Sequence, residues 1–493
     1  MKTSIQDFLL KHTAKNTISF HMPGHKGSAI YKRFGYTEFL ERFMDCDVTE
    51  IPGADNLFQA EGVIKEVQDR YAGLYGAKKS YLLINGTSGG IIAAILAAVP
   101  KGKKLIMARN CHKSVFNALA LADIQPVYAY PEMIEEYGIS GVVPPAQIDK
   151  LLSSNPDAEA VILPSPNYYG ICSDIEKIAG IVHKHGKVLI IDEAHGAHLT
   201  FFNQFGIQGM PKSAGGSGAD VVIKSIHKTL ASFTQSAVLS VYSDRVDPYL
   251  LEDKLQCIES TSPSYILMSS LDINASIIEE HGQQVFTEWA ENLNYFYENA
   301  KKIEGLKIMD KMDGFDWTKL NFSLGELGMN GAELEKVLTG KYGIFIELYT
   351  GDVVMCMTGI GNTKDHMVKL TDALAEIAAE RRADAAAGTG AVGKKLSGTE
   401  GAATDKATQK LVRLIVPKQA ELFEIPKYKK RVPLSEAAGQ ICASSIIPYP
   451  PGIPLVCPGE KLDAETVEYI KTLRAFGEKV IGVNEQGEIF VGK

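Results

Sequence analysis

The chain has 493 residues, of which 45% are hydrophobic and 22% are charged, and its formal net charge is -8 at pH 7. This composition predicts a globular protein of two or three domains. The acidic balance argues against a nucleic-acid-binding protein and mildly favours a cationic small molecule as ligand. Such acidity is also ordinary for solubility. We find neither an apolar run of about 18 residues, which would predict a membrane span, nor the apolar stretch of a signal peptide. Seven cysteines without a CxxC pair favour free thiols, so we expect a cytoplasmic protein.

Along the chain, residues 1–75 are weakly periodic and are expected to form an N-terminal arm. From residue 76 to 300, short apolar strands alternate with helical segments, which is typical of βαβ units and a mostly parallel sheet. The expected strands are Ser80–Ile84, Lys104–Ala108, Ala160–Leu163, Lys187–Ile191 and Asp220–Ile223, and the expected helices are Ile91–Val99, His112–Ala122 and Ser173–His185. The pattern therefore predicts an α/β fold with a large domain over residues 76–300.

After residue 300 the pattern changes to antiparallel-looking strands with intervening helices, and we expect a smaller α+β domain over residues 301–382. Its expected elements are the strands Lys307–Met309, Lys319–Ser323, Ile344–Leu348 and Val353–Met357 and the helix Lys364–Glu380. Residues 383–405 are rich in Ala, Gly, Ser and Thr and lack large apolar side chains, which predicts a flexible linker. Residues 406–493 would then form a C-terminal domain.

The functional argument starts from Lys228, which follows the predicted strand Asp220–Ile223. The carboxyl end of such a strand opens into the crevice where α/β sheets bind ligands. A lysine in this position is more often an ordinary surface residue, so Lys228 needs support from other motifs.

The first support is Asp192, in the run Asp-Glu-Ala-His at the end of another apolar strand. A carboxylate there could pair with a protonated pyridine nitrogen and keep the ring cationic, so that the ring takes up electrons from a substrate carbanion. The same run is also a helicase box, but that interpretation needs a GxxxxGK[ST] loop, and no Gly-Lys here is followed by Ser or Thr. A zinc site at His195 and His198 is a further alternative, without an HExxH or CxxC context.

The second support is the small-residue turn Asn85–Gly90, between a predicted strand and a predicted helix. Its backbone N–H groups and hydroxyls, together with the helix dipole, would hold a phosphate, and Ser225 could supply another hydroxyl. The third support is His112, whose imidazole could stack on a flat ring; a helix-terminal histidine without a ligand explains it equally well. A lysine, an aspartate and a phosphate turn at strand ends together indicate pyridoxal 5′-phosphate.

With these residues in place, the chain resembles the ornithine/lysine/arginine decarboxylase family, which has the aspartate aminotransferase-like fold (PLP fold type I). The resemblance covers nearly the whole chain. The matching motifs are the ranges His21–Gly27, Thr49–Gly53, Asn85–Ser88, Arg109–Ser114, Asp192–His198, Ser225–Lys228, Thr261–Tyr265 and Pro448–Pro454. The fold implied is a large domain with a mostly parallel seven-stranded-type sheet, plus smaller α+β domains.

The resemblance also implies a role for each matched residue. Lys228 would form the Schiff base, Asp192 would bind the pyridine nitrogen, and His112 and Ala194 would lie on the two ring faces. The phosphate would be held by Thr87, Ser88, Gly89 and Ser225, with His227 beside it and beside the substrate carboxylate. The expected cofactor-binding set is Gly86, Thr87, Ser88, Gly89, His112, Asp192, Ala194, His195, Ser225, His227, Lys228 and Ser262, and the expected catalytic set is Lys228, His227, His112 and Asp192.

Ser262 lies in the segment Thr261–Tyr265, which the resemblance assigns to the site of a partner subunit, so we expect a homodimer or a higher homo-oligomer with shared sites. The chain resembles the short form, without the N-terminal wing domain of the large inducible members. Ser88-Gly89-Gly90 replaces a more hydroxyl-rich run of those members.

The expected reaction is decarboxylation of a basic L-amino acid, with arginine to agmatine in polyamine biosynthesis as first choice and lysine or ornithine as alternatives. An aminotransferase or lyase of the same fold and a silent paralogue acting as a regulatory subunit remain open. A basic substrate side chain needs an acidic partner, for which the candidates are Asp47, Glu50, Asp55 and Glu347.

Overall fold

The computed structural model describes residues 4–386, 422–448, 453–475 and 479–493, and its largest sheet in these ranges has seven strands in the order β2-β10-β9-β8-β7-β3-β4. The strands are β2 (Lys79–Leu83), β3 (Lys104–Ala108), β4 (Gln125–Ala129), β7 (Ala158–Pro164), β8 (Val188–Asp192), β9 (Val221–Lys224) and β10 (Ala237–Val241). Five neighbouring strands run parallel, and β10 runs antiparallel to both of its neighbours. The predicted mostly parallel seven-stranded sheet is confirmed.

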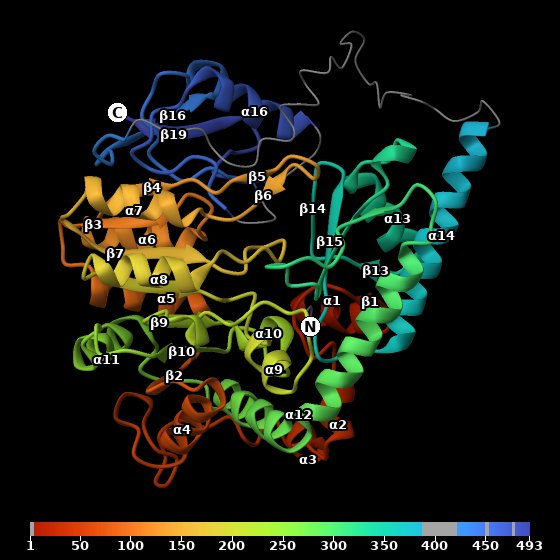
Figure 1. Cartoon of the computed structure of the whole chain (residues 1–493), viewed down its shortest axis with the longest axis horizontal. Coiled ribbons are helices and arrows are strands. Elements are labelled where there is room, and N and C mark those ends of the chain that lie inside the picture. The colour runs from red at the N-terminus through yellow and green to blue at the C-terminus, as the bar shows by residue number, and fades with distance from the viewer. Residues whose placement is uncertain (1–3, 387–421, 449–452, 476–478) are drawn as a thin grey trace.

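The sheet is buried on both faces, which explains why its strands are nearly continuous apolar runs such as Val-Leu-Ile-Ile-Asp in β8. Helices lie against it in Figure 1. They are α5 (Gly86–Ala98), α6 (Lys113–Ala122), α7 (Pro145–Ser154), α8 (Ile175–Lys184) and α11 (Pro248–Ile258). Because β7, β8 and β9 run parallel, their carboxyl ends open at one edge of the sheet, which is where ligands bind in this architecture.

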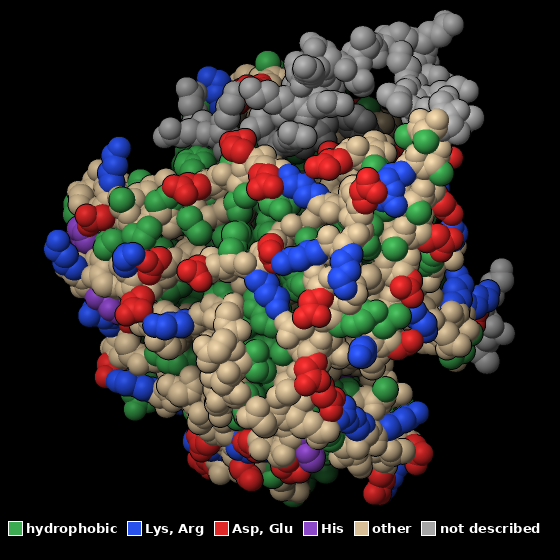
Figure 2. All heavy atoms as spheres, turned by 45° about the vertical axis from the view of Figure 1, so that its right-hand side comes forward, with side chains coloured by type: hydrophobic (Ala, Val, Ile, Leu, Met, Phe, Trp, Pro, Cys, Tyr) green, Lys and Arg blue, Asp and Glu red, His purple; other side chains and the backbone are tan. Residues whose placement is uncertain are grey.

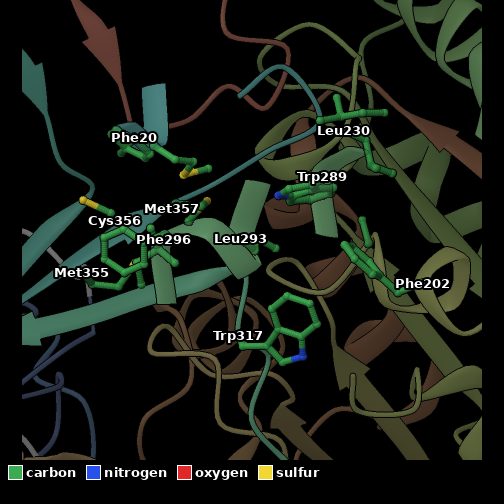
Figure 3. Packing of buried hydrophobic residues seen from close by; sticks show 14 of the residues in the cluster. Phe20, Phe202, Leu230, Trp289, Leu293, Phe296, Trp317, Met355, Cys356 and Met357 are labelled. Carbon is green, nitrogen blue, oxygen red and sulfur yellow. The ribbon is translucent and has the colours of Figure 1, made fainter. Parts of the chain in front are cut away.

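A second, four-stranded sheet has the order β11-β12-β15-β14. Its strands are β11 (Lys307–Ile308), β12 (Lys319–Ser323), β14 (Leu348–Thr350) and β15 (Val353–Met357), and the helices α13 (Gly331–Tyr342) and α14 (Lys364–Ala386) follow in the same region. The 36-residue helix α12 (Tyr265–Ala300) packs along α14 and links this sheet to the large one (Figure 1). Between the two sheets lies an aromatic core in which Phe202, Trp289 and Trp317 lie together (Figure 3).

One strand prediction is wrong in its extent. The expected strand Ile344–Leu348 is divided into β13 (Ile344–Phe345), which pairs in parallel with β1 (Ile18–Ser19), and β14, which pairs with β15. The chain leaves one sheet and enters the other around Glu347, whose backbone N–H donates to Met355 O. The N-terminal segment thus forms its own two-stranded sheet with β13, and Phe20 O accepts a 2.8 Å hydrogen bond from Met357 N of β15.

The part of the C-terminal region that the structure describes has its own small core. It contains β16 (Lys429–Pro433) paired with β19 (Glu488–Gly492), β17 (Ile447–Pro448) paired with β18 (Val480–Ile481), and α16 (Ala464–Ala475). This unit lies beyond the β3–β4 edge of the large sheet (Figure 1). Of the predicted linker, residues 383–386 belong to α14, and residues 387–405 lie outside the described residues.

Charged side chains of both signs are interspersed over the face of the molecule in Figure 2. Among the described helices, none combines the length and the apolar character that crossing a membrane requires.

Candidate active site

Lys228 lies in the short helix α10 (Ile226–Thr229), directly after β9. Its Nζ is 2.9 Å from Nε2 of His195 and 5.8 Å from the centre of the Tyr168 ring. Burial lowers the pKa of the Lys228 amine, and this outweighs the opposite effect of Asp192 and Glu347. Because an amine is nucleophilic only when it is neutral, this environment suits imine formation.

Asp192 ends β8, the strand next to β9, and is buried. Its Oδ1 accepts a hydrogen bond of 3.1 Å from the backbone N–H of Ala194. Burial raises the pKa of the Asp192 carboxyl, with Lys228 acting in the opposite sense. A carboxylate in such a site favours a cationic partner, and a protonated ring nitrogen would be one.

Two hydroxyls from separate strand ends meet at the start of α5. Thr87 Oγ1 and Ser225 Oγ lie 3.1 Å apart, and Ser88 follows in the first turn. The sequence predicts a helix from Ile91, but α5 already begins at Gly86 and so includes the small residues before Ile91. Gly86 has φ +67°, a conformation that favours glycine. The free N–H groups of this first turn and the two hydroxyls make a site for a phosphate.

Gly89 has a packing reason to be glycine. A Cβ there would lie 3.2 Å from both Glu259 Oε1 and Ile258 Cγ2. Its N–H already donates to Asn85 O at 3.4 Å. Its predicted contact with a phosphate stays a prediction.

His112 caps α6, and its Nδ1 lies 2.9 Å from Ser114 Oγ. Burial, reinforced by Lys228 and Lys113, lowers the pKa of His112 to about 3. The imidazole is therefore neutral at ordinary pH, which suits stacking against a cationic ring.

His227 precedes Lys228, and its Nδ1 lies 2.8 Å from Ser236 O. Because a carbonyl oxygen only accepts, Nδ1 carries the proton in the neutral ring, and Nε2 is left as an acceptor. Burial lowers the pKa of His227 to about 4. The His227 carbonyl in turn accepts a 2.7 Å hydrogen bond from Gly24 N, so the motif 21–27 packs against the lysine helix.

Of the four acidic candidates for the substrate side chain, Glu347 is the one that acts electrostatically on Lys228. Its Oε2 lies 2.7 Å from His21 Nδ1 and accepts a 2.9 Å hydrogen bond from Met22 N. Burial would raise the pKa of the Glu347 carboxyl, but His21, Met22 and Lys228 hold it below its ordinary value. Glu347 is thus a buried anion beside the lysine.

The other three acidic candidates are less suitable for binding the side chain of the substrate. Asp55 accepts hydrogen bonds from five backbone N–H groups between residues 56 and 65, so its carboxylate is used in holding the start of α4 (Val63–Tyr75). Asp47 and Glu50 are exposed in the single chain.

Ser262 lies at the surface of the single chain, and its predicted role in a partner's site stays a prediction. It is exposed between α11 and α12, where its N–H donates to Ser260 Oγ at 3.2 Å. Ala194 is buried close to Asp192 in the sequence, and its place on a ring face stays a prediction.

Tyr168 is a site residue that the sequence prediction missed. It follows β7, the strand next to β8, and its ring centre is 4.5 Å from that of His195. A signal was present, because Tyr168 follows the end of a strand, as Lys228 does.

The described residues contain no group of three or more His, Cys, Asp or Glu side chains that could hold a metal ion, so nothing supports the zinc alternative at His195 and His198. His195 contacts Lys228, and His198 contacts Asp316 and Thr229.

These residues fit pyridoxal phosphate. An aldehyde needs an amine, a pyridinium needs an anion and a phosphate needs N–H and hydroxyl donors, and Lys228, Asp192 and the Thr87–Ser225 pair supply them. Within the described residues, Nδ1 of His195 is buried without a hydrogen-bond partner, which leaves one polar atom of the site for a bound group.

Comparison with known proteins agrees with this chemistry. The chain matches the model of the Orn/Lys/Arg decarboxylase major domain over residues 3–321 and that of the family's C-terminal domain over residues 402–488. It is 29% identical over 483 residues to an arginine decarboxylase of Bacillus subtilis, covering 95% of this chain and 93% of the relative. It is 32% identical over 488 residues to the uncharacterized protein YaaO of the same organism, covering 98% and 96%.

Among solved structures, lysine decarboxylase A from Pseudomonas aeruginosa is similar in fold, with a TM-score of 0.76 and 22% identity over 98% of this chain and 80% of that one. The family and the fold imply pyridoxal phosphate as cofactor. The chain belongs to the Orn/Lys/Arg decarboxylase family and is an amino-acid decarboxylase of PLP fold type I.

Proposed function

We propose that this protein decarboxylates L-arginine to agmatine, with pyridoxal phosphate bound through Lys228. The observation that carries the proposal is the buried amine of Lys228, with the buried carboxylates Asp192 and Glu347 both acting on it. One carboxylate suits a ring nitrogen and the other a basic substrate. Relatives named arginine decarboxylase, at 29% identity and more than 90% coverage, support arginine over lysine or ornithine.

When bound, the cofactor supplies a pyridinium ring that takes up the electron pair released as carbon dioxide leaves. Lys228 contributes a neutral amine, and Asp192 contributes the anion for the ring nitrogen. His112 and Ala194 would hold the ring between them. Thr87, Ser88 and Ser225, with Gly86 and Gly89 in the same turn, would hold the phosphate.

The substrate would be oriented by groups on both sides of Lys228. His227 offers the free Nε2 of a neutral imidazole near the reacting end. Glu347 offers its Oε1, since His21 and Met22 both contact Oε2. A guanidinium donates several hydrogen bonds to a carboxylate, so Glu347 is our candidate for binding the arginine side chain. His195 and Tyr168, whose rings contact each other beside the amine, would limit the access of water.

We further propose a homodimer or higher homo-oligomer in which Ser262 serves the site of the partner subunit. The helix α1 (Ser4–Thr13) has no buried residue, and it exposes Ile5, Phe8, Leu9 and Leu10. Met44 and Ile51, also apolar, are exposed in the segment that follows. Apolar surface of this kind favours a protein interface. All seven cysteines are free thiols, which suits the proposed location in the cytoplasm. A role in polyamine biosynthesis would follow from the proposed product, agmatine.

The test is to incubate the purified protein and pyridoxal phosphate with arginine, lysine and ornithine in turn and to identify the amines by chromatography. We expect agmatine and one equivalent of carbon dioxide from arginine. Lysine or ornithine turnover alone would overturn the substrate assignment. A keto acid would indicate an aminotransferase, and cofactor binding without any turnover would indicate a silent paralogue.

A further inference from the structure

A second buried lysine, Lys319, is linked to Lys228 through His195. It is on β12 in the four-stranded sheet, and its side chain is wholly buried. Its Nζ donates a 2.6 Å hydrogen bond to the backbone carbonyl of His195 and a 2.7 Å hydrogen bond to Asp316 Oδ2. Lys319 therefore joins the four-stranded sheet to the loop that follows β8.

The network continues from Asp316 back to the helix that carries Lys228. Asp316 Oδ1 lies 3.1 Å from His198 Nε2, and His198 Nδ1 lies 3.1 Å from Thr229 Oγ1. Lys319 is thus connected to the lysine helix by two routes. One passes through His195 to the amine of Lys228, and the other passes through Asp316 and His198 to Thr229.

This network lies in the interior of the protein. Asp316 and His198 are fully buried, and the His198 ring centre is 5.3 Å from that of Trp289, which lies in the aromatic core of Figure 3. Burial alone would raise the pKa of the Asp316 carboxyl, but His198 and Lys319 bring it well below its ordinary value. Charges in such a site act over longer distances than charges in water.

We propose that Lys319 is a positioning residue for Lys228: it fixes the His195 backbone, and its ammonium favours the neutral form of the neighbouring amine. This inference rests on the proposed role of Lys228. The charged groups that face Lys228 are Asp192 from β8, Glu347 from the segment between β13 and β14, and Lys319 from β12. The imidazoles that surround it, those of His112, His195 and His227, have lowered pKa values and are neutral.

The sign of each effect is fixed by charge. Asp192 and Glu347 raise the pKa of Lys228, whereas Lys319 and burial lower it. Replacing Lys319 with the uncharged Met removes one positive neighbour, so the pKa of Lys228 should rise. A role in folding alone would lower stability without moving this pKa.

The experiment measures how fast Lys228 in cofactor-free protein reacts with trinitrobenzenesulfonate as a function of pH, with the labelled peptide quantified by mass spectrometry. Only the neutral amine reacts, so the midpoint of the profile reports the pKa. For Lys319→Met we expect the midpoint to rise by on the order of one pH unit. Lys319→Arg, which retains the charge, should recover most of the wild-type midpoint.

Lys224→Met is the matched control. Lys224 is another fully buried lysine, and its Nζ lies 3.6 Å from the buried carboxylate of Glu193, whereas the charges that shift the pKa of Lys228 are those of Asp192, Glu347 and Lys319. The control should lose stability and keep the wild-type midpoint. An unchanged midpoint in Lys319→Met, or an equal shift in both variants, would overturn the inference.

Lys319→Met leaves Asp316 as an unpaired buried charge, so the protein could fail to fold. The double variant Asp316→Asn with Lys319→Met removes both charges and keeps the volume, and because these charges have opposite signs it should show an upward shift smaller than that of Lys319→Met. Because the labelling uses no cofactor, its result stands apart from the proposed function. If wild-type protein failed to form a cofactor absorbance band at about 420 nm, the proposed function would fail, while the labelling would still decide the role of Lys319.

Discussion

The amine of Lys228 lies 2.9 Å from Nε2 of His195, although 33 residues separate the two along the chain. They meet because β9 and β8 are parallel neighbours, so the segments that follow these strands share one edge of the sheet. The imidazole of His195 has a pKa well below its ordinary value, chiefly through burial and then through Lys228. The lysine therefore has a neutral polar neighbour rather than a cationic one.

Glu347 should determine how well the enzyme binds a basic side chain. We expect Glu347→Gln to lower kcat/KM for arginine by about 10- to 100-fold, because a charge-assisted hydrogen bond contributes about 1.5–3 kcal/mol. Most of the loss should lie in KM. Steady-state kinetics would measure it, with Asp47→Asn as a control from the exposed acids. Equal effects of the two substitutions would argue against a specific role for Glu347.

His112 should make the protein sensitive to acid. Its pKa is about 3 in the folded protein, against 6.5 for a histidine freely exposed to water, so the unfolded chain binds more protons between these values. The contribution of His112 to stability is therefore complete above about pH 6.5 and is lost as the pH falls toward 3. Thermal unfolding of the wild type and of His112→Phe should be measured between about pH 5 and 7.5. The melting temperature of the variant should depend less steeply on pH than that of the wild type. Parallel curves would contradict this account.

Arg109 and Glu460 should hold the C-terminal unit on the large sheet. Arg109 Nη2 lies 3.0 Å from Glu460 Oε2, both side chains are buried, and Arg109 Nη1 also donates to Pro454 O at 2.7 Å. Glu460→Ala leaves a buried charge unpaired, so we expect a loss of about 3–5 kcal/mol in unfolding free energy.

Denaturant unfolding would measure the effect of Glu460→Ala. Glu288→Ala, which breaks the exposed pair of Arg33 and Glu288, is the control and should change little. A similar loss of unfolding free energy in both variants would mean that the buried pair stabilises the protein no more than the exposed pair does.

The apolar face of α1 should belong to a subunit interface. We expect Phe8→Asp combined with Leu9→Asp to convert the oligomer to monomers in light scattering and to lower activity, because Ser262 could no longer reach a partner's site. The control is Lys11→Asp, which places a negative charge on the same helix at a polar position. A monomeric wild-type protein that retains full activity would refute the shared site.

The sequence was sufficient to predict the residues that follow strand ends. Lys228 and Asp192 each follow an apolar run, and parallel strands bring such positions together without further information. The start of α5 at Gly86 was not predicted, because glycine is a poor helix former and only the tertiary setting makes this turn helical.

Contacts between distant segments were also beyond prediction. Lys319 meets His195 across 124 residues, and Glu347 meets Met22 across 325. Such pairs depend on how the two sheets pack, and neither periodicity nor local motifs carry that information. The four acidic candidates looked alike in the sequence, and only burial and hydrogen bonding separate Glu347 from Asp55.

The covalent attachment at Lys228 is the claim on which the account depends, and borohydride reduction followed by peptide mapping tests it most directly. Protein loaded with pyridoxal phosphate should carry the reduced adduct on Lys228, and Lys228→Ala should carry none and lose activity by on the order of 10³-fold or more. The exposed Lys150→Ala should behave as wild type. An adduct on another lysine, with Lys228 unmodified in active protein, would contradict the account.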